Sequence, residues 1–520
     1  MRRLELRNFT AACTGRPRPT AVAAVVATAL GLFVAPAAMS QTDTATASDV
    51  QSLKNQVQQL QRQIDALQVP QAAAQSTPAA TTAPSEGPGF QAGPVTVTFG
   101  GFTELATIFR NRNQVADVGS NWNGGIPFPN SANAHTSEFR ESARQSRLTI
   151  LAQGPQDGNA LAEGYFEMDF VGAAPTANSN QSNSYNPRMR QIYGTYARKD
   201  SGFYMLAGQA WSFATLSNQG LRGHSEQVPM TIDGSFVPGF DWTWNPQMRF
   251  VKEFSNKFSA GISFESPQAN IFNGPNALPP NTVFSNPGGP GFASTSIYST
   301  DVAPDVVAKV AFDPGFGHYE LYGLARWFRD RVGGTNNTTT GGGVGGGLVL
   351  PVVANVLNVQ ASFLAGRGIG RYGAAQLPDV TLRPDGSLAT VSEYHALLGA
   401  DYRPATDWTV YAYLGRENAS ARNFTAVANG TTLGYGYGSA LYDNSGCLTL
   451  GSTVCAANTS SIDQATAGAW WKFYQGKLGN LQFGLQGSYT KRKTFAGVGG
   501  APSANMTVGM LSFRYYPYQK

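Results

Sequence analysis

Residues 481–490 read LQFGLQGSYT, and the polarity of this stretch alternates from one residue to the next. A β-strand turns successive side chains to opposite faces, so a period of two with one apolar face predicts a strand between an apolar and an aqueous environment. The apolar face holds Leu481, Phe483, Leu485 and Tyr489, and the polar face holds Gln482, Gln486, Ser488 and Thr490.

The same alternation recurs in GYFEMDF (164–170), FSAGISFE (258–265) and VLNVQASFLA (356–365). We expect an all-β fold of about sixteen antiparallel strands, with short connections alternating with long ones such as 213–245, 332–342 and 419–463. The expected strands are 94–110, 140–153, 160–172, 187–199, 202–212, 246–254, 257–266, 304–314, 317–331, 343–351, 354–366, 392–403, 407–418, 464–474, 480–493 and 504–516.

The composition agrees with a barrel in a membrane. Charged residues make up 13% of the 520 residues, mean hydropathy is −0.22, aromatics reach 11% and there are 59 glycines. Few charges with many neutral polar, glycine and aromatic residues are typical of a transmembrane β-barrel, which faces lipid outside and water inside. The sequence therefore predicts an outer-membrane β-barrel over residues 94–520.

The first 40 residues predict a secretory signal peptide. Five arginines precede the apolar run AVAAVVATALGLFVA (21–35), and small residues follow it. Without residues 1–40 the chain holds 32 basic and 31 acidic residues, a net charge of +1 instead of +5. Bulk charge therefore gives no support to a nucleic-acid partner.

Residues 41–68 predict a short α-helical coiled coil. Apolar residues recur there at intervals of 3, 4, 3, 4 and 3, which is an a/d seam of about three heptads. Such a short seam is marginal alone, and its heptads leave dimer and trimer open. The Pro/Ala-rich stretch 69–93 predicts a linker to the barrel. The seam is Val50, Leu53, Val57, Leu60, Ile64 and Leu67.

Two cysteines, Cys447 and Cys455, follow the predicted signal peptide, and they lie eight residues apart in a Gly/Ser/Thr-rich stretch. In an exported chain this spacing predicts a disulfide that closes a loop. A metal site is the weaker interpretation because no histidine is near in sequence.

The order of signal, short coiled coil, Pro/Ala linker and barrel resembles that of the DcaP-like trimeric porins. The strings SARQSRLTI (142–150), PRMRQIYGTYA (187–197) and LAGQAWSF (206–213) are similar to the early strands of that family. The resemblance implies a homotrimer in the outer membrane of a Gram-negative cell, in contact with lipid and lipopolysaccharide. It also implies diffusion of small solutes, with a preference for anions such as carboxylates.

Arginines are the candidate selectivity residues, because a guanidinium pairs well with a carboxylate and charged side chains at a constriction select ions. The barrel region holds 21 Arg and 9 Lys. For any single arginine, a charge at the rim or a paired structural ion is favoured over a role in selectivity. The candidates are Arg147, Arg188, Arg190, Arg222 and Arg326.

The third long connection, residues 213–245, holds Arg222, His224, Glu226, Asp233 and Asp241. Two interpretations stay open: it folds into the lumen as in general porins, or it is an ordinary outer loop.

The sequence predicts no enzyme, no cofactor and no metal. GIGRYG (368–373) matches a dinucleotide-binding glycine pattern, but AAQLPDV follows it where a helix is required. The four histidines, at positions 135, 224, 318 and 395, show no triad or metal spacing. The alternatives to a porin are an adhesin or envelope tether that works through the coiled coil and, less favoured, a barrel phospholipase.

Overall fold

The structure is a computed structural model that describes residues 89–116, 125–172, 186–233, 237–287 and 297–519. The chain divides into two units, 1–75 and 76–520, and all the described residues lie in the second. The expected signal peptide (1–40), coiled coil (41–68) and most of the linker (69–93) lie outside the described residues and stay predictions.

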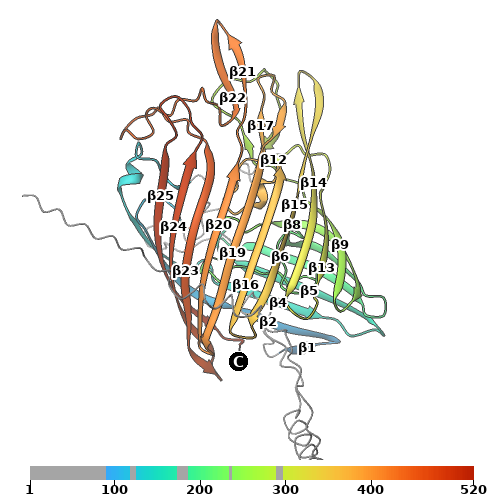
Figure 1. The fold of residues 1–520 in the computed structure, drawn as a ribbon. Helices are drawn as coiled ribbons and strands as arrows, with labels where there is room; N and C mark the ends of the chain where they lie inside the picture. The colour runs from blue at the N-terminus through green and yellow to red at the C-terminus, as the bar shows by residue number, and fades with distance from the viewer. Residues whose placement is uncertain (1–88, 117–124, 173–185, 234–236, 288–296, 520) are drawn as a thin grey trace, which may run out of the picture. The chain divides into compact units, whose positions relative to one another are not determined.

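A closed antiparallel barrel of sixteen strands forms the wall of the molecule (Figure 1). This confirms the all-β fold and the strand number expected from alternation. The wall strands are β2 (Val95–Arg110), an interrupted strand made of β3 (Glu138–Ser142) and β4 (Arg147–Gln153), β5 (Ala160–Asp169), β6 (Arg188–Arg198), β7 (Phe203–Trp211), β8 (Trp244–Ser255), β9 (Phe258–Glu265), β13 (Asp305–Phe312), β14 (His318–Val332), β15 (Thr335–Val353), β16 (Leu357–Arg367), β19 (Ser392–Ala405), β20 (Trp408–Ala419), β23 (Thr459–Gly476), β24 (Gly479–Thr494) and β25 (Ser503–Tyr516).

Strand β2 closes the barrel because it pairs with both ends of the sheet. Its second half pairs with the last strand, from Thr103↔Tyr515 onward, and its first half pairs with β4 up to Phe102↔Arg147. The short strand β1 (Phe90–Ala92) forms a hairpin with the start of β2. Closure leaves the wall without a free edge, which a sheet in lipid requires.

The two faces of the wall differ as the alternation predicts. On β24, Phe483 is 50% exposed and Leu485 61% exposed, whereas Gln486 and Thr490 are buried. The apolar residues therefore point outward and the polar residues inward. The interior is filled by polar side chains and by inserted loops.

The two ends of the barrel also differ. Short turns such as 199–202, 256–257 and 406–407 lie at one end, here called the turn end, with the C-terminus (Figure 1). The long connections lie at the other, here called the loop end. The loop end carries small sheets that the alternation did not predict: β10 (Ile271–Phe272) with β17 (Val380–Leu382) and β18 (Leu388–Thr390), β11 (Ser285–Pro287) with β12 (Ile297–Ser299), and β21 (Arg422–Ala428) with β22 (Thr431–Tyr437).

The expected long connection 332–342 was wrong. Strand β15 begins at Thr335, so only Gly333 and Gly334 join it to β14, both with positive φ (56° and 86°). Two such residues form the tight turn that matches the twist of a hairpin. The glycine-rich run that follows is a strand, and at Gly345 a Cβ would lie 2.3 Å from the ring of Tyr322.

The glycine pattern GIGRYG is part of a loop, as expected. It holds the 3₁₀ turn η2 (Gly370–Tyr372) between β16 and β17, with no parallel β-α-β unit around it. A second 3₁₀ turn, η1 (Ala132–His135), lies in the connection before β3. Among the described residues no helix is long and apolar enough to cross a membrane.

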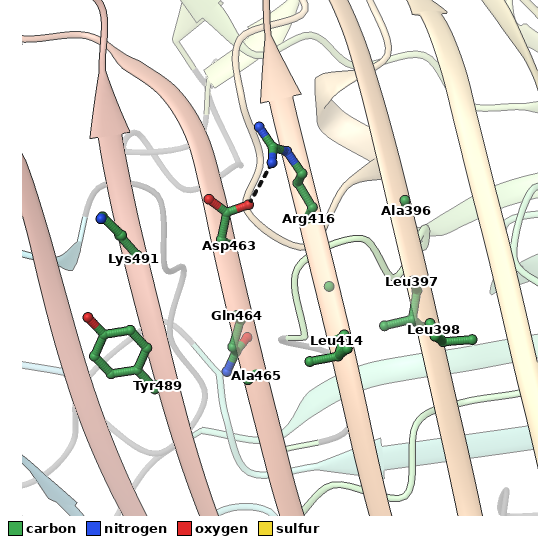
Figure 2. A pocket seen from close by; sticks show the side chains of 11 residues that line it. Ala396, Leu397, Leu398, Leu414, Arg416, Asp463, Gln464, Ala465, Tyr489 and Lys491 are labelled. Atoms are coloured by element: carbon green, nitrogen blue, oxygen red, sulfur yellow. Dashed lines mark ion pairs between the residues drawn. The ribbon is translucent and has the colours of Figure 1, made fainter. Parts of the chain in front are cut away.

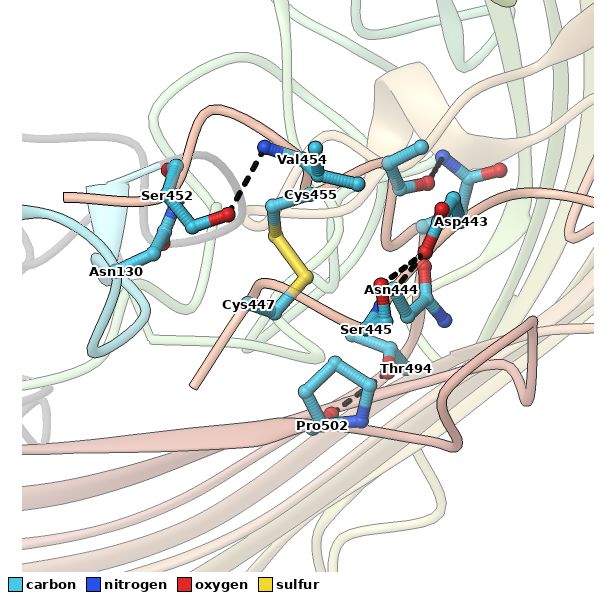
Figure 3. The surroundings of a disulfide bond; sticks show 12 residues. Asn130, Asp443, Asn444, Ser445, Cys447, Ser452, Val454, Cys455, Thr494 and Pro502 are labelled. Carbon is cyan, nitrogen blue, oxygen red and sulfur yellow. Dashed lines mark hydrogen bonds between the residues drawn. A yellow bond between two sulfur atoms is a disulfide. The ribbon is translucent and has the colours of Figure 1, made fainter. Parts of the chain in front are cut away.

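A disulfide joins Cys447 and Cys455 in the long loop before β23 (Figure 3). Asn130, from the connection between β2 and β3, is hydrogen-bonded into this loop three times. Its amide donates to the carbonyl of Cys447 (3.0 Å), its carbonyl accepts from Gly451 (2.9 Å) and its side chain donates to the carbonyl of Ser452 (3.0 Å). The cross-linked loop is therefore fastened to a neighbouring loop at the loop end.

Candidate pore constriction

The connection from β7 to β8, residues 212–243, folds into the barrel and crosses its interior. Its amides donate hydrogen bonds to wall side chains far around the circumference: Ser217 to Glu320 on β14 (3.0 Å), Met230 to Tyr413 on β20 (2.9 Å) and Ile232 to Gln486 on β24 (2.7 Å). The inward interpretation of the third long loop is therefore confirmed.

Apolar contacts hold the same loop in place. Ile232, Val237 and Phe240 are buried in a cluster with Tyr411, Trp470 and other residues of the far wall. The indole of Trp470 also donates to the carbonyl of Met230 (2.8 Å). A loop fastened in this way occupies part of the interior that the wall strands enclose.

Three of the expected arginines meet at that wall. Arg188 and Arg190 both point inward, and each forms an ion pair with Asp169 on β5, at 2.7 and 3.1 Å. Arg190 also pairs with Glu167, and Arg147 on β4 lies 3.5 Å from that carboxylate. The two carboxylates thus hold three guanidinium groups in one patch.

Aromatic rings support these guanidinium groups. Those of Arg190 and Arg188 lie 4.1 and 5.0 Å from the ring centre of Trp244, at the end of the inserted loop. Trp244 contacts Trp211 and Trp242, whose ring centres lie 5.2 and 4.9 Å away. Stacking restricts the arginines and leaves their hydrogen-bonding edges for other partners.

Sequence reasoning missed Arg514, on the last wall strand. It pairs with Glu104 at 3.0 Å, lies over the rings of Phe102 (4.7 Å) and Trp470 (4.5 Å), and donates to the carbonyl of Ile232 (2.9 Å). The signal was present in the sequence, because alternation that turns Leu511, Phe513 and Tyr515 to one face turns Arg514 to the other.

The other two expected arginines are placed differently. Arg222 forms an ion pair with Glu253 at 2.6 Å, near the turn end of β8. Arg326 is fully buried and pairs with Asp305 at 3.1 Å and with Asp379. Its charge is balanced by two carboxylates, so Arg326 anchors the 368–391 loop and has no free face toward a solute.

The patch of Arg147, Arg188, Arg190 and Arg514 carries a small positive excess. Its carboxylates are Glu104, Glu167 and Asp169, so the balance is 4 − 3 = +1. Several arginine nitrogens are bound to carboxylates, but each guanidinium has five N–H donors. The patch can therefore accept an anion beside its own ion pairs.

Burial shifts the pKa values of several titratable groups of the inserted loop. Burial raises the pKa of Glu226 against the opposing effect of Arg249, and burial likewise raises the pKa of Asp233 and of Asp241. Burial also lowers the pKa of His224 to about 4. These acids give up their protons at higher pH than ordinary carboxylic acids.

The histidines serve the structure in separate places. His395 pairs with Asp241 at 2.6 Å, and His318 lies between Asp313 and Glu320 at 2.8 and 3.2 Å. Across the ranges that the structure describes, no three His, Cys, Asp or Glu side chains gather in a way that could hold a metal ion.

Comparison with known proteins finds the fold but no sequence relative: no family model and no curated protein matches. Among solved structures, the outer membrane channel DcaP of Acinetobacter baumannii matches with a TM-score of 0.58 at 16% identity, over 82% of this chain and 99% of that one. The resemblance to DcaP-like porins is thereby confirmed at the level of fold.

More distant matches include an anion-selective porin from Comamonas acidovorans, with a TM-score of 0.44 at 13% identity over 81% of this chain and 99% of that one. OmpF of Salmonella typhi has a TM-score of 0.45 at 10% identity, over 82% and 100%.

Proposed function

We propose that this chain is an outer-membrane porin through which small hydrophilic solutes diffuse, and that it favours anions such as carboxylates. The closed barrel shares its fold with an outer membrane channel, which supports the channel role. The observation that carries the anion preference is the inward-facing patch of four arginines against three carboxylates beside the inserted loop.

The chemistry of the patch suits carboxylates in particular. A guanidinium presents a planar fork of donors that matches two carboxylate oxygens, and the rings of Phe102 and Trp244 hold these forks in fixed planes. A solute carboxylate can exchange places with the carboxylates of Glu167 or Asp169. Passage requires binding of this moderate kind, strong enough for entry and weak enough for release.

We further propose a homotrimer in the outer membrane, with the turn end in the periplasm and the long loops outside. Short periplasmic turns and long outer loops are the usual arrangement of such barrels. The predicted coiled coil of residues 41–68 then lies in the periplasm, where its short seam adds to contacts between the barrels.

Single-channel recording in planar bilayers tests this function. Under a KCl gradient we expect stepwise conductance and a reversal potential with the same sign as the equilibrium potential of chloride. When acetate replaces chloride, acetate should also carry current. A cation-selective reversal potential would overturn the anion preference, and absence of conductance would overturn the channel role. A variant without residues 41–88 should still conduct, whereas a protein that worked as a tether would lose its function.

A further inference from the structure

The outward face of the barrel carries a row of charges where neighbouring positions are apolar. Arg416 on β20 is in register with Asp463 on β23, which is in register with Lys491 on β24. Lys493 lies two residues further along β24 and faces the same way. These four residues are called the outer charged row.

The neighbours of the row show that it points away from the interior. Leu414, two residues before Arg416, is 58% exposed, and Tyr489, two residues before Lys491, is 48% exposed. Side chains two apart on a strand share a face. The row therefore lies on the surface that faces the membrane.

The height of the row on the barrel places it at the edge of the apolar band. A row of aromatic side chains, Trp408, Trp471 and Phe483, marks the same face near the turn end. From Trp408 to Arg416 is eight residues, which is about 27 Å along a strand and roughly 21 Å of height at the usual tilt. The apolar band of such barrels is about 25 Å tall, so the row lies at head-group level on the loop side.

The row has an excess of positive charge. Asp463 pairs with Arg416 at 3.4 Å and with Lys493 at 3.1 Å. The balance is 3 − 1 = +2, and Lys491 has no hydrogen bond or ion pair with any residue that the structure describes. The Nε of Arg416 is likewise without a hydrogen-bond partner there.

An apolar hollow lies directly below these charges (Figure 2). Two small outward residues, Ala396 and Ala465, leave room between the larger Leu398, Leu414 and Tyr489. The hollow is shaped for a narrow apolar chain, and the cations at its upper end suit an anionic head group joined to that chain.

We propose that the outer charged row binds a phosphate of lipopolysaccharide, with one of its acyl chains in the hollow. An acylated sugar phosphate matches both halves of the site: its phosphate meets Arg416, Lys491 and Lys493, and its hydrocarbon meets Leu398 and Leu414. Lipid-facing charges cost little stability near the interface. Binding of an anionic lipid that neutralises them is favourable in free energy. The proposal needs only that the barrel lies in the outer membrane, and it does not depend on the ion preference of the pore.

The test uses the full mature chain, refolded in detergent free of lipopolysaccharide, with purified bisphosphorylated lipid A as the probe. In the triple variant Arg416→Gln, Lys491→Gln, Lys493→Gln, the affinity for lipid A should fall by a factor of about ten or more. Native mass spectrometry measures this affinity. The charge-preserving variant Lys491→Arg, Lys493→Arg should bind as the wild type does. A matched control removes three cations at the turn end, with Lys199, Lys257 and Lys477 changed to Gln, and should also bind as the wild type does.

The phosphate is tested separately from the acyl chains. Dephosphorylated lipid A should bind the wild type about as weakly as bisphosphorylated lipid A binds the triple variant. Equal binding by the triple variant and the wild type would overturn the proposal, as would equal binding of phosphorylated and dephosphorylated lipid A. A triple variant that dissociates into monomers without lipid would also overturn it, because the row would then be a contact between subunits.

Discussion

Arg147 and Arg514 lie at opposite ends of the barrel sequence, yet both guanidinium groups lie over the ring of Phe102, 5.3 and 4.7 Å from its centre. Barrel closure brings them together, because β2 pairs with β4 on one side and with β25 on the other. The candidate constriction is therefore a product of closure, and it requires the whole sheet.

Arg147 is the best single test of the arginine patch. We expect Arg147→Gln to lower the anion-to-cation permeability ratio about fivefold, since one charge within 4 Å of an ion is worth about 1 kcal/mol in water. Glu167 keeps Arg190 as a partner, so the barrel should fold. Reversal potentials under a KCl gradient measure the ratio. Arg198→Gln, an exposed change at the turn end, is the control, and an equal effect of both changes would refute the role of the patch.

Arg326 tests whether a buried guanidinium holds the 368–391 loop. Arg326→Met leaves Asp305 and Asp379 buried without this partner, which should cost about 3–5 kcal/mol of unfolding free energy. Tryptophan fluorescence during urea unfolding in liposomes measures the loss. Adding Asp305→Asn and Asp379→Asn should restore part of the stability, because the uncompensated charges are then gone. A triple variant as unstable as the single one would contradict this explanation.

Local pattern predicted the wall of this barrel well and its interior less well. Alternation in stretches such as 481–490 depends only on which face meets lipid, so each expected strand overlaps a wall strand. The path of the inserted loop depends on contacts such as Ile232 with Gln486, which are 254 positions apart. Sequence spacing alone does not encode such contacts.

Irregularities in single strands also escaped prediction. A register shift between β5 and β6 lets Arg190 and Gln191 both reach Glu167, where strict alternation would turn one of them outward. The first part of β15 was missed because residues 335–342 (TNNTTTGG) are polar and glycine-rich and show no apolar alternation.

The disulfide should stabilise its own loop and leave the barrel unchanged. Replacing Cys447 and Cys455 by Ser removes the closure of a short loop, worth about 2–3 kcal/mol in the chain-entropy model. We expect proteinase K to cut the 438–458 loop faster in this variant, with the same urea midpoint for the barrel. Reduced wild-type protein should be cut at the rate of the variant. A large fall in the midpoint would mean that the loop supports the wall itself.

His224 should make docking of the inserted loop sensitive to acid. Its ring lies 3.9 Å from that of Tyr165, and burial lowers its pKa to about 4, against an ordinary value of about 6.5. The docked loop thus binds fewer protons than a released loop, so docking is strongest above about pH 6.5 and weakens as pH falls toward 4. The raised pKa values of Glu226 and Asp233 act in the opposite direction, because these acids favour docking at low pH.

Single-channel records between pH 7 and 4 measure this sensitivity through the frequency of large conductance fluctuations. We expect the fluctuations to increase in the wild type as pH falls below about 6.5 and to increase less in His224→Gln, which has no proton to gain. His135→Gln is the control. Among the described hydrogen bonds, the His135 side chain has one, with the carbonyl of Pro129, and both residues lie in the connection between β2 and β3. If His224→Gln fluctuates as much as the wild type at pH 4, His224 plays no part in the acid response.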